Sequence, residues 1–232
     1  MSKTTFITGA NKGLGFETAR RLTALGHTVL LGARDPQRGH KAAAEIGARF
    51  VRVDVTDDAS VAAAAADVAA HEGKIDLLIN NAGIAGEMLP ADELNGEHAS
   101  LVFSTNVAGI VRVTSAFLPL LRKSEAPAVV NVTSGLGSVA LTLDPERVES
   151  QVIAPLYTAS KAAVTMLTTQ YAKAIPDVRF NGADPGYTAT DLNGNTGPQT
   201  VTEGTDAIVT LATEGPAAGT GRVIDRYGPS AW

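Results

Sequence analysis

The residues with the clearest chemical potential are Tyr157 and Lys161, which stand four positions apart. On an α-helix this spacing puts both side chains on one face, and Pro155 suits the start of such a helix. A tyrosine hydroxyl has a pKa of about 10, and a nearby ammonium favours the phenolate and lowers that pKa. The pair is therefore predicted to act as a general acid and base, with Tyr157 giving a proton to a carbonyl oxygen.

A glycine-rich turn near the N-terminus is a second candidate site. The segment Thr8-Gly9-Ala10-Asn11-Lys12-Gly13-Leu14-Gly15 follows the first apolar run and precedes a helical pattern. Gly9 allows a tight turn, Gly13 lets the backbone approach a pyrophosphate, and Gly15 lets the helix pack closely on the strand. The helix N-terminus offers free N–H groups and a positive dipole end to an anion. The turn predicts a dinucleotide phosphate site formed by Gly9, Asn11, Lys12, Gly13, Leu14 and Gly15.

The residues after the second apolar run indicate which dinucleotide binds. An NAD site wants a carboxylate here for the ribose hydroxyls, but the sequence has Ala33 and then Arg34. A guanidinium matches a 2′-phosphate bidentately, and Lys12 could add a second charge. We expect NADP(H) as the cofactor. Two alternatives stay open: both cations are solvated surface charges, or Asp35 turns inward and favours NAD.

Two further strand ends are predicted to border the cofactor. Asp54, followed by Val55, could accept the adenine amino group or could instead cap the helix that begins near Asp57. After the fourth apolar run, the small residues around Asn81 would let a cofactor lie against the backbone. These positions are Asn81, Ala82 and Gly83.

The elements that must position these residues alternate along the chain. Short runs rich in Val, Ile, Leu and Phe have little polar alternation, as expected of strands covered on both faces. Strand and helix repeated in this way predict one α/β domain over residues 1–232, a Rossmann-type doubly wound parallel sheet of about seven strands. The predicted strands are Thr4–Thr8, Thr28–Gly32, Phe50–Val53, Leu77–Asn80, Val129–Thr133, Arg179–Ala183 and Arg222–Arg226, with helices near 14–25, 37–46, 58–71, 97–122, 157–174 and 201–213.

Together these motifs resemble the single-domain form of the short-chain dehydrogenase/reductase family. The resemblance covers essentially the whole chain in order, and it is specific because five motifs recur together: Thr8–Gly15, Asn80–Gly83, Ser134, Tyr157–Lys161 and Pro185-Gly186. Lys12 and Arg34 look like the NADP-preferring members, which include carbonyl reductases. The resemblance implies reversible hydride transfer between NADP(H) and a ketone or aldehyde. A redox sensor that binds NADP(H) without catalysis is the alternative.

The resemblance also implies roles for individual residues. Ser134 would hydrogen-bond the substrate oxygen, with Thr133 as a competing hydroxyl. Lys161 would also hold the nicotinamide ribose, and Asn106 would position a water that relays protons to it. The segment from Pro185 and Gly186 to Thr190 would lie over the nicotinamide. The Thr190 hydroxyl would face the carboxamide there, with Thr188 as its rival.

Two departures from the family pattern bear on the substrate. Asp184 stands where many members have a small or apolar residue, and it could be a structural acceptor or a charge bordering the pocket. Ser134 and Tyr157 are 23 positions apart, roughly ten more than in typical relatives. Asp144 and Pro145 predict a short helix within this enlarged segment, and 147–153 is expected to pack one face down. The segment is either a wall of the substrate pocket or a surface insertion.

Composition excludes several other functions. The formal net charge of −5 gives no support for binding nucleic acid or an anionic membrane surface. There are no cysteines, and the 4 histidines follow no ligand spacing, so no metal site is expected. No apolar stretch is expected to reach the roughly 18 residues of a membrane span. We expect a cytoplasmic protein that acts on a small molecule, and a homodimer or homotetramer paired through 97–122 and 157–174.

Overall fold

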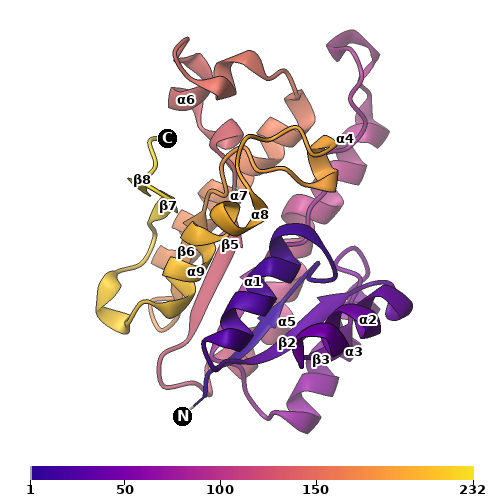
Figure 1. The fold of residues 1–232 in the computed structure, drawn as a ribbon, viewed down its shortest axis with the longest axis vertical. Coiled ribbons are helices and arrows are strands. Elements are labelled where there is room, and N and C mark those ends of the chain that lie inside the picture. Colours follow the sequence, from indigo (N-terminus) through magenta and orange to yellow (C-terminus); the bar gives the residue numbers. More distant parts are fainter. Residues whose placement is uncertain (1) are drawn as a thin grey trace.

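One sheet of eight strands organises the chain (Figure 1) in the computed structural model, which describes residues 2–232. The strand order is β3-β2-β1-β4-β5-β6-β7-β8, and every pair is parallel except β7 and β8. The expectation of a doubly wound parallel sheet is confirmed, and the strand beyond the expected seven is the short antiparallel β8. The strands are β1 (Thr4–Ile7), β2 (Thr28–Ala33), β3 (Arg49–Arg52), β4 (Leu77–Asn80), β5 (Ala128–Val132), β6 (Arg179–Ala183), β7 (Val223–Asp225) and β8 (Gly228–Pro229).

The order of the strands fixes where a ligand can lie. From β1 the chain winds outward through β2 and β3, and then returns to pair β4 with the other side of β1. At this reversal the connections leave on opposite faces and open a crevice beyond the carboxyl ends of the strands. All the predicted site segments follow strands that end at this edge.

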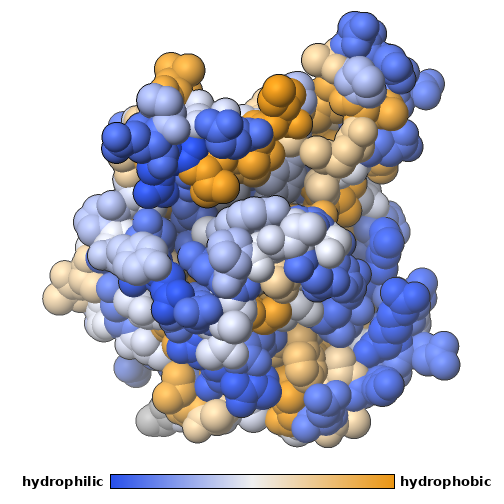
Figure 2. All heavy atoms as spheres, turned by 45° about the horizontal axis from the view of Figure 1, so that its top comes forward, coloured by the Kyte–Doolittle hydropathy of each residue, from blue (hydrophilic) through white to orange (hydrophobic). Residues whose placement is uncertain are grey.

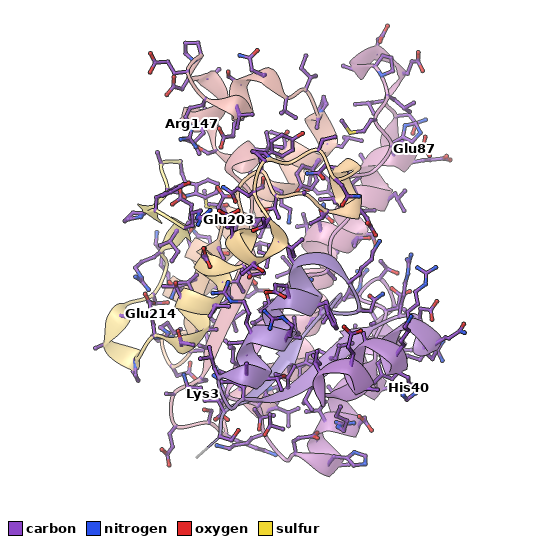
Figure 3. The ribbon with its side chains drawn as sticks, in the orientation of Figure 1. Lys3, His40, Glu87, Arg147, Glu203 and Glu214 are labelled. Atoms are coloured by element: carbon purple, nitrogen blue, oxygen red, sulfur yellow. The ribbon has the colours of Figure 1, made fainter. Side chains whose placement is uncertain are left out.

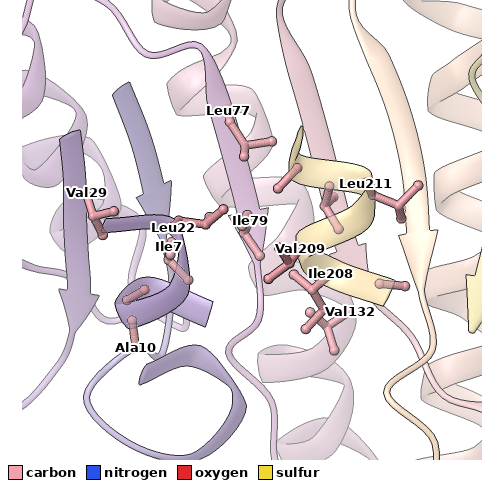
Figure 4. Packing of buried hydrophobic residues seen from close by; sticks show 14 of the residues in the cluster. Ile7, Ala10, Leu22, Val29, Leu77, Ile79, Val132, Ile208, Val209 and Leu211 are labelled. Carbon is pink, nitrogen blue, oxygen red and sulfur yellow. The ribbon is translucent and has the colours of Figure 1, made fainter. Parts of the chain in front are cut away.

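Helices cover both faces of the sheet because each strand is apolar on both sides. One hydrophobic cluster joins α1, α2 and α9 to the sheet, and Figure 4 shows Leu22 and Ile208 packed on Ile79 and Val132 within it. The other cluster joins α3, α5 and α7 to the opposite face. The helices are α1 (Gly13–Ala24), α2 (Pro36–Ile46), α3 (Asp58–His71), α4 (Gly96–Phe103), α5 (Gly109–Leu121), α6 (Val139–Leu143), α7 (Pro155–Ala174), α8 (Val201–Gly204) and α9 (Asp206–Thr213).

Two predicted helices differ in detail from the structure. The stretch 97–122 is helical throughout, but a π-helical turn, η2 (Ser104–Ala108), separates α4 from α5. The stretch 201–213 is divided at Thr205, whose buried hydroxyl donates to the carbonyl of Thr202. Short 3₁₀ turns complete the chain: η1 (Ala91–Glu93), η3 (Gly135–Gly137), η4 (Val148–Gln151), η5 (Asp191–Asn193) and η6 (Pro216–Ala218).

The run Gly96–Leu121 corrects the expectation that no segment could span a membrane. At 26 residues it is long and apolar enough to do so by length and composition. In the structure its buried residues, which include Val113 and Phe117, pack in the cluster shared with α3 and the sheet. A helix that covers one face of a sheet passes the same test, because one side of it must be continuously apolar.

Candidate active site

The turn between β1 and α1 has the geometry of an anion site. Gly9 has a φ of +64° and lies so close to the next strand end that a Cβ on it would be 2.9 Å from the Cα of Ala82. A Cβ on Gly15 would be 2.6 Å from the carbonyl oxygen of Gly9, so the helix packs directly on the turn. The helix begins at Gly13, and Lys12 at its N-cap makes no side-chain cap. The first N–H groups of α1 therefore face the crevice, as an anion requires.

Thr8 and Asn81 hold this turn in place. The Asn81 amide donates to the carbonyls of Thr8 at 2.9 Å and Gly9 at 3.1 Å. The Thr8 hydroxyl accepts from the backbone N–H groups of Asn81 and Ala82 at 3.0 and 3.1 Å. The sequence predicted Asn81 as a cofactor contact, whereas its side chain is used to brace the turn. Thr8 was missed as a functional residue, although its place before Gly9 was visible.

The alternatives left open for Asp35, after β2, and for Asp54, after β3, can be compared with the structure. Asp35 caps α2 and accepts the N–H of Arg38 at 3.0 Å, so it does not turn toward the crevice. Asp57 caps α3, so the alternative that Asp54 caps it is wrong. Asp54 instead accepts from the backbone and hydroxyl of Thr56, and these bonds hold its pKa below the usual range. Arg34 is exposed at the end of β2.

The remaining predicted cofactor residues fall into two groups. Val55 packs on Gly109 of α5, and Leu14 packs on Gly204 of α8. Thr188 is buried, and its hydroxyl donates to the carbonyl of Pro185 at 2.8 Å. The other predicted positions lie in the segments that follow β1, β4 and β6 at the carboxyl edge of the sheet: Asn11, Lys12, Gly13, Ala82, Gly83, Pro185, Gly186 and Thr190.

The predicted acid–base pair lies on α7, as its spacing required. The Lys161 ammonium donates to the carbonyl of Val132 at 2.8 Å and lies 5.6 Å from the centre of the Tyr157 ring. Lys161 is buried, and Tyr157 is partly buried. The ammonium is therefore fixed beneath the tyrosine at the end of β5.

Asn106 is turned inward by the π-helical turn. Its Oδ1 accepts the N–H of Ile84 at 2.9 Å, and its Nδ2 donates to the carbonyl of Ile84 and the hydroxyl of Ser160. A Cβ built on Gly83 would lie 3.4 Å from Asn106 Oδ1 and 3.8 Å from Lys161 Nζ. The asparagine and lysine therefore flank one point beside Gly83, as the predicted relay requires. π-Turns recur at functional positions because they aim one side chain differently.

The two hydroxyls at the end of β5 face different ways. The Ser134 hydroxyl lies near Tyr157 and lowers the pKa of the phenol, although burial has the larger and opposite effect. The Thr133 hydroxyl is buried and has no hydrogen-bond partner within residues 2–232. The structure therefore brings Ser134, and not Thr133, to the tyrosine.

The expected lowering of the Tyr157 pKa is wrong for this structure. Burial raises the pKa of Tyr157 to about 12, and it lowers the pKa of Lys161 to about 8. Both changes have the same cause, because removal from water disfavours the charged form of each group. The phenol is thus protonated at neutral pH.

An apolar hollow opens beside Tyr157. Its walls are residues 85–94, which follow β4, and residues 153–157, which lead into α7. Figure 2 shows hydrophobic side chains gathered around a hollow on this face, and Figure 3 places Glu87 and Arg147 on the two rises that flank it. Met88 is 66% exposed and Ile153 is 81% exposed, so both present apolar surface that the chain itself leaves uncovered.

The enlarged segment between Ser134 and Tyr157 differs from its predicted form. The helix is α6, capped by Ser138, and Asp144 follows its end where the prediction began a helix. Val148 and Val152 are exposed, and the residue that packs down is Glu149. Glu149 can be buried despite its charge because the Arg147 guanidinium pairs with it at 3.0 Å. The end of this segment forms a wall of the hollow.

Comparison with known proteins gives consistent matches over nearly the whole chain. The family model described as short chain dehydrogenase matches residues 3–200. The chain is 36% identical to short-chain dehydrogenase anuI of Penicillium roqueforti, over 94% of this chain and 92% of that protein. It is 30% identical to (+)-neomenthol dehydrogenase of Capsicum annuum, over 89% and 90%. The crystal structure of NADPH-bound carbonyl reductase from chicken fatty liver matches with a TM-score of 0.88 and 28% identity, over 100% of this chain and 99% of that one.

Proposed function

The chain belongs to the short-chain dehydrogenase/reductase family of oxidoreductases, and from this premise we propose that it reduces a ketone or aldehyde carbonyl with NADPH. The observation that carries the proposal is the convergence of Ser134, Tyr157 and Lys161 beside the β1–α1 turn. A sensor that only bound the cofactor would have no need for this arrangement.

The residues of the crevice fit a dinucleotide phosphate. The exposed N-terminus of α1 and the open space at Gly13 suit the pyrophosphate. Arg34 and Lys12 suit a 2′-phosphate, and Asp35 does not compete because it caps α2. That the carbonyl reductase of similar structure contains NADPH supports the same choice. When bound, the cofactor supplies the hydride.

The protein's own groups handle the proton and the charge. Tyr157 holds a proton at neutral pH and is placed to give it to the substrate oxygen as negative charge develops there. The Ser134 hydroxyl, which lies beside the tyrosine, can donate to the same oxygen. The Lys161 ammonium beneath them stabilises the phenolate that remains. Asn106 stands beside Lys161 and is placed to hold a water that returns the proton.

The apolar walls of the hollow favour an apolar substrate. A carbonyl compound with a hydrophobic body would cover Met88 and Ile153 and gain roughly 25 cal/mol for each Å² of apolar surface removed from water. One relative is named (+)-neomenthol dehydrogenase, and neomenthol is a small alicyclic alcohol. This name supports an apolar substrate for the present chain. The direct test is NADPH oxidation with a panel of apolar ketones, aldehydes and diketones. Binding of NADPH without turnover of any member would favour the sensor.

Replacing Arg34 by alanine should erase most of the preference for NADPH over NADH. In the unmodified protein we expect NADPH to bind at least about tenfold more tightly, about 1.4 kcal/mol. The guanidinium is exposed at the end of β2, where it can reach a 2′-phosphate. NADH has no phosphate at this position. Fluorescence titration with both cofactors measures the two dissociation constants. Arg38→Ala, one turn into α2, is the matched control, and equal constants in the unmodified protein would contradict the assignment.

Replacing Asp191 by asparagine should tighten NADPH binding by about threefold. Lys12 pairs with Asp191 at 2.9 Å, and both side chains are well exposed, at 59% and 66%. Such a pair contributes roughly 0 to 1 kcal/mol, so its loss costs little stability while it frees the ammonium for a phosphate. Asp177→Asn, which breaks the exposed pair with Arg122, is the control. Weaker NADPH binding in Asp191→Asn would show that Asp191 assists the cofactor.

A further inference from the structure

A buried carboxylate stands beside the catalytic group without a part in the reaction described above. Asp184 directly follows β6, and its side chain is 4% exposed. Val132 of β5 pairs with Ala183 of β6, and the N–H of Thr133 donates to the carbonyl of Ala183 at 2.8 Å. The register of the sheet therefore sets Asp184 next to the turn that carries Ser134.

This carboxylate contacts the backbone of two turns at once. Its Oδ1 accepts the N–H of Gly186 at 2.9 Å. Its Oδ2 lies close to Gly135, 2.9 Å from where a Cβ there would be. Burial raises the pKa of Asp184, and the nearby N–H groups of Gly186 and Gly135 oppose that rise. One side chain thus joins the turn after β5, which holds Ser134, to the turn after β6, which borders the cofactor crevice.

A second carboxylate reaches the same place from the enlarged segment. Glu149 of η4 is 8% exposed, and the Arg147 guanidinium bonds both of its oxygens, at 3.0 and 3.2 Å. A Cβ on Gly135 would lie 2.8 Å from Glu149 Oε1 and 2.9 Å from Asp184 Oδ2. The two carboxylates therefore enclose Gly135 and fill the space that a side chain there would need.

We infer that Asp184 and Glu149 form a carboxylate clamp around Gly135 that positions the Ser134 hydroxyl for the reduction, with Asp184 as its positioning residue. The inference rests on the proposed function, since Ser134 is useful only if it meets the substrate oxygen. Ser134 directly precedes Gly135, so a displacement of the turn moves the hydroxyl with it. A misplacement of about 1 Å in an active site can cost 10²-fold in rate.

Asp184 also acts on the acid–base pair through its charge. The titratable groups that face it are Asp225 of β7 and Glu149 of η4, which raise its pKa, and Tyr157 and Lys161 of α7. An ionised Asp184 raises the pKa of Lys161 and so opposes the effect of burial. A residue with a purely structural role would not move the titration of its neighbours, so this charge gives the clamp a distinct signature.

The test compares Asp184→Asn with the unmodified enzyme in ketone reduction from about pH 6 to pH 9.5. Asparagine keeps the acceptor for Gly186 and removes the charge. Lys161 should then lose its proton at lower pH, and the alkaline limb of kcat should move down by about one pH unit, which is tenfold at the limb. At pH 6 the loss of kcat should be about threefold, with KM and NADPH affinity unchanged.

Two further variants complete the design. Glu149→Gln should lower kcat by about threefold at all pH values, because the turn is released from one side. Glu146→Gln, an exposed carboxylate of the same segment, should match the unmodified enzyme. An Asp184→Asn profile that superposes on the unmodified one overturns the inference. If Asp184→Asn does not fold, an unchanged kcat in Glu149→Gln overturns it instead.

A thermal unfolding cycle in the absence of substrate separates this inference from the proposed function. The change in Tm that Asp184→Asn causes should be more unfavourable when Lys161 is present than in the Lys161→Met background. Equal effects in the two backgrounds would overturn the coupling. A favourable coupling together with no turnover of any carbonyl would support the effect of Asp184 on Lys161 and contradict the proposed function.

Discussion

Replacing Tyr157 by phenylalanine is expected to lower turnover by roughly 10² to 10⁴-fold, the usual contribution of a general acid. The change removes one hydroxyl and keeps the ring above the Lys161 ammonium, which lies 5.6 Å from the ring centre. Affinity for NADPH should therefore stay within a few-fold. Single-turnover rates at saturating NADPH measure the chemical step, and cofactor titration measures the binding.

Tyr171→Phe is the matched control for this experiment. Tyr171 lies on the same helix and stacks on Phe180 at 5.2 Å, away from the crevice. Its loss of a hydroxyl should leave turnover close to normal. Near-normal turnover in Tyr157→Phe would place the proton donor elsewhere and would contradict the proposed mechanism.

Replacing Lys161 by methionine should abolish most of the activity and, at neutral pH, stabilise the fold. The buried ammonium has a pKa of about 8, against 10.5 for an exposed lysine. The difference corresponds to about 3 kcal/mol of folding free energy that burial of the charge costs. Methionine has a similar length and no charge, but it leaves the carbonyl of Val132 without its donor, which costs about 1 kcal/mol. A net gain of about 2 kcal/mol is expected at pH 7.

The stability gained by Lys161→Met should decrease as the pH rises from 8 to 10.5. Below pH 8 the lysine is protonated in both the folded and unfolded states, and the full cost applies. Between pH 8 and 10.5 the unfolded state binds more protons than the folded state, so the stability of the unmodified protein rises relative to the variant. The advantage of Lys161→Met should shrink across this window. Urea unfolding at several pH values measures it, and Lys173→Met in the last turn of the same helix is the control. A constant difference would contradict the low pKa of Lys161.

Local patterns in the sequence predicted the fold and much of the site. The strands were found because runs such as Leu77–Asn80 are buried on both faces and therefore continuously apolar. The β1–α1 turn was found because Gly9 and Gly15 are needed for their backbone geometry, which a sequence displays directly. The spacing of Tyr157 and Lys161 fixed their common face once a helix was assumed.

Properties that depend on distant parts of the chain were not predicted. The pKa of Tyr157 is raised by burial, and no local pattern gives the depth of burial. A carboxylate rarely packs inward without a partner, and no local pattern shows that Glu149 has one. Only the folded segment brings Arg147 to it and sets the Glu149 carboxylate close to that of Asp184 beside Gly135. The bracing role of Thr8 likewise depends on β1 and β4 being neighbours in the sheet.

Because of the π-helical turn at Ser104–Ala108, the direction of the Asn106 side chain does not depend on the faces that α4 and α5 bury. Such a turn amounts to one extra residue in an otherwise regular helix. Deleting one residue there would let α4 and α5 join as a continuous α-helix, with each half keeping the face it buries. The shortened chain should fold as well as the natural one or better. A shift of one residue along an α-helix turns the side chain by about 100° around the helix axis. The amide of Asn106 would then no longer lie beside Lys161 and Gly83. A single-residue insertion in a regular helix would thus be enough to turn one side chain of an element that covers the sheet toward the proposed site.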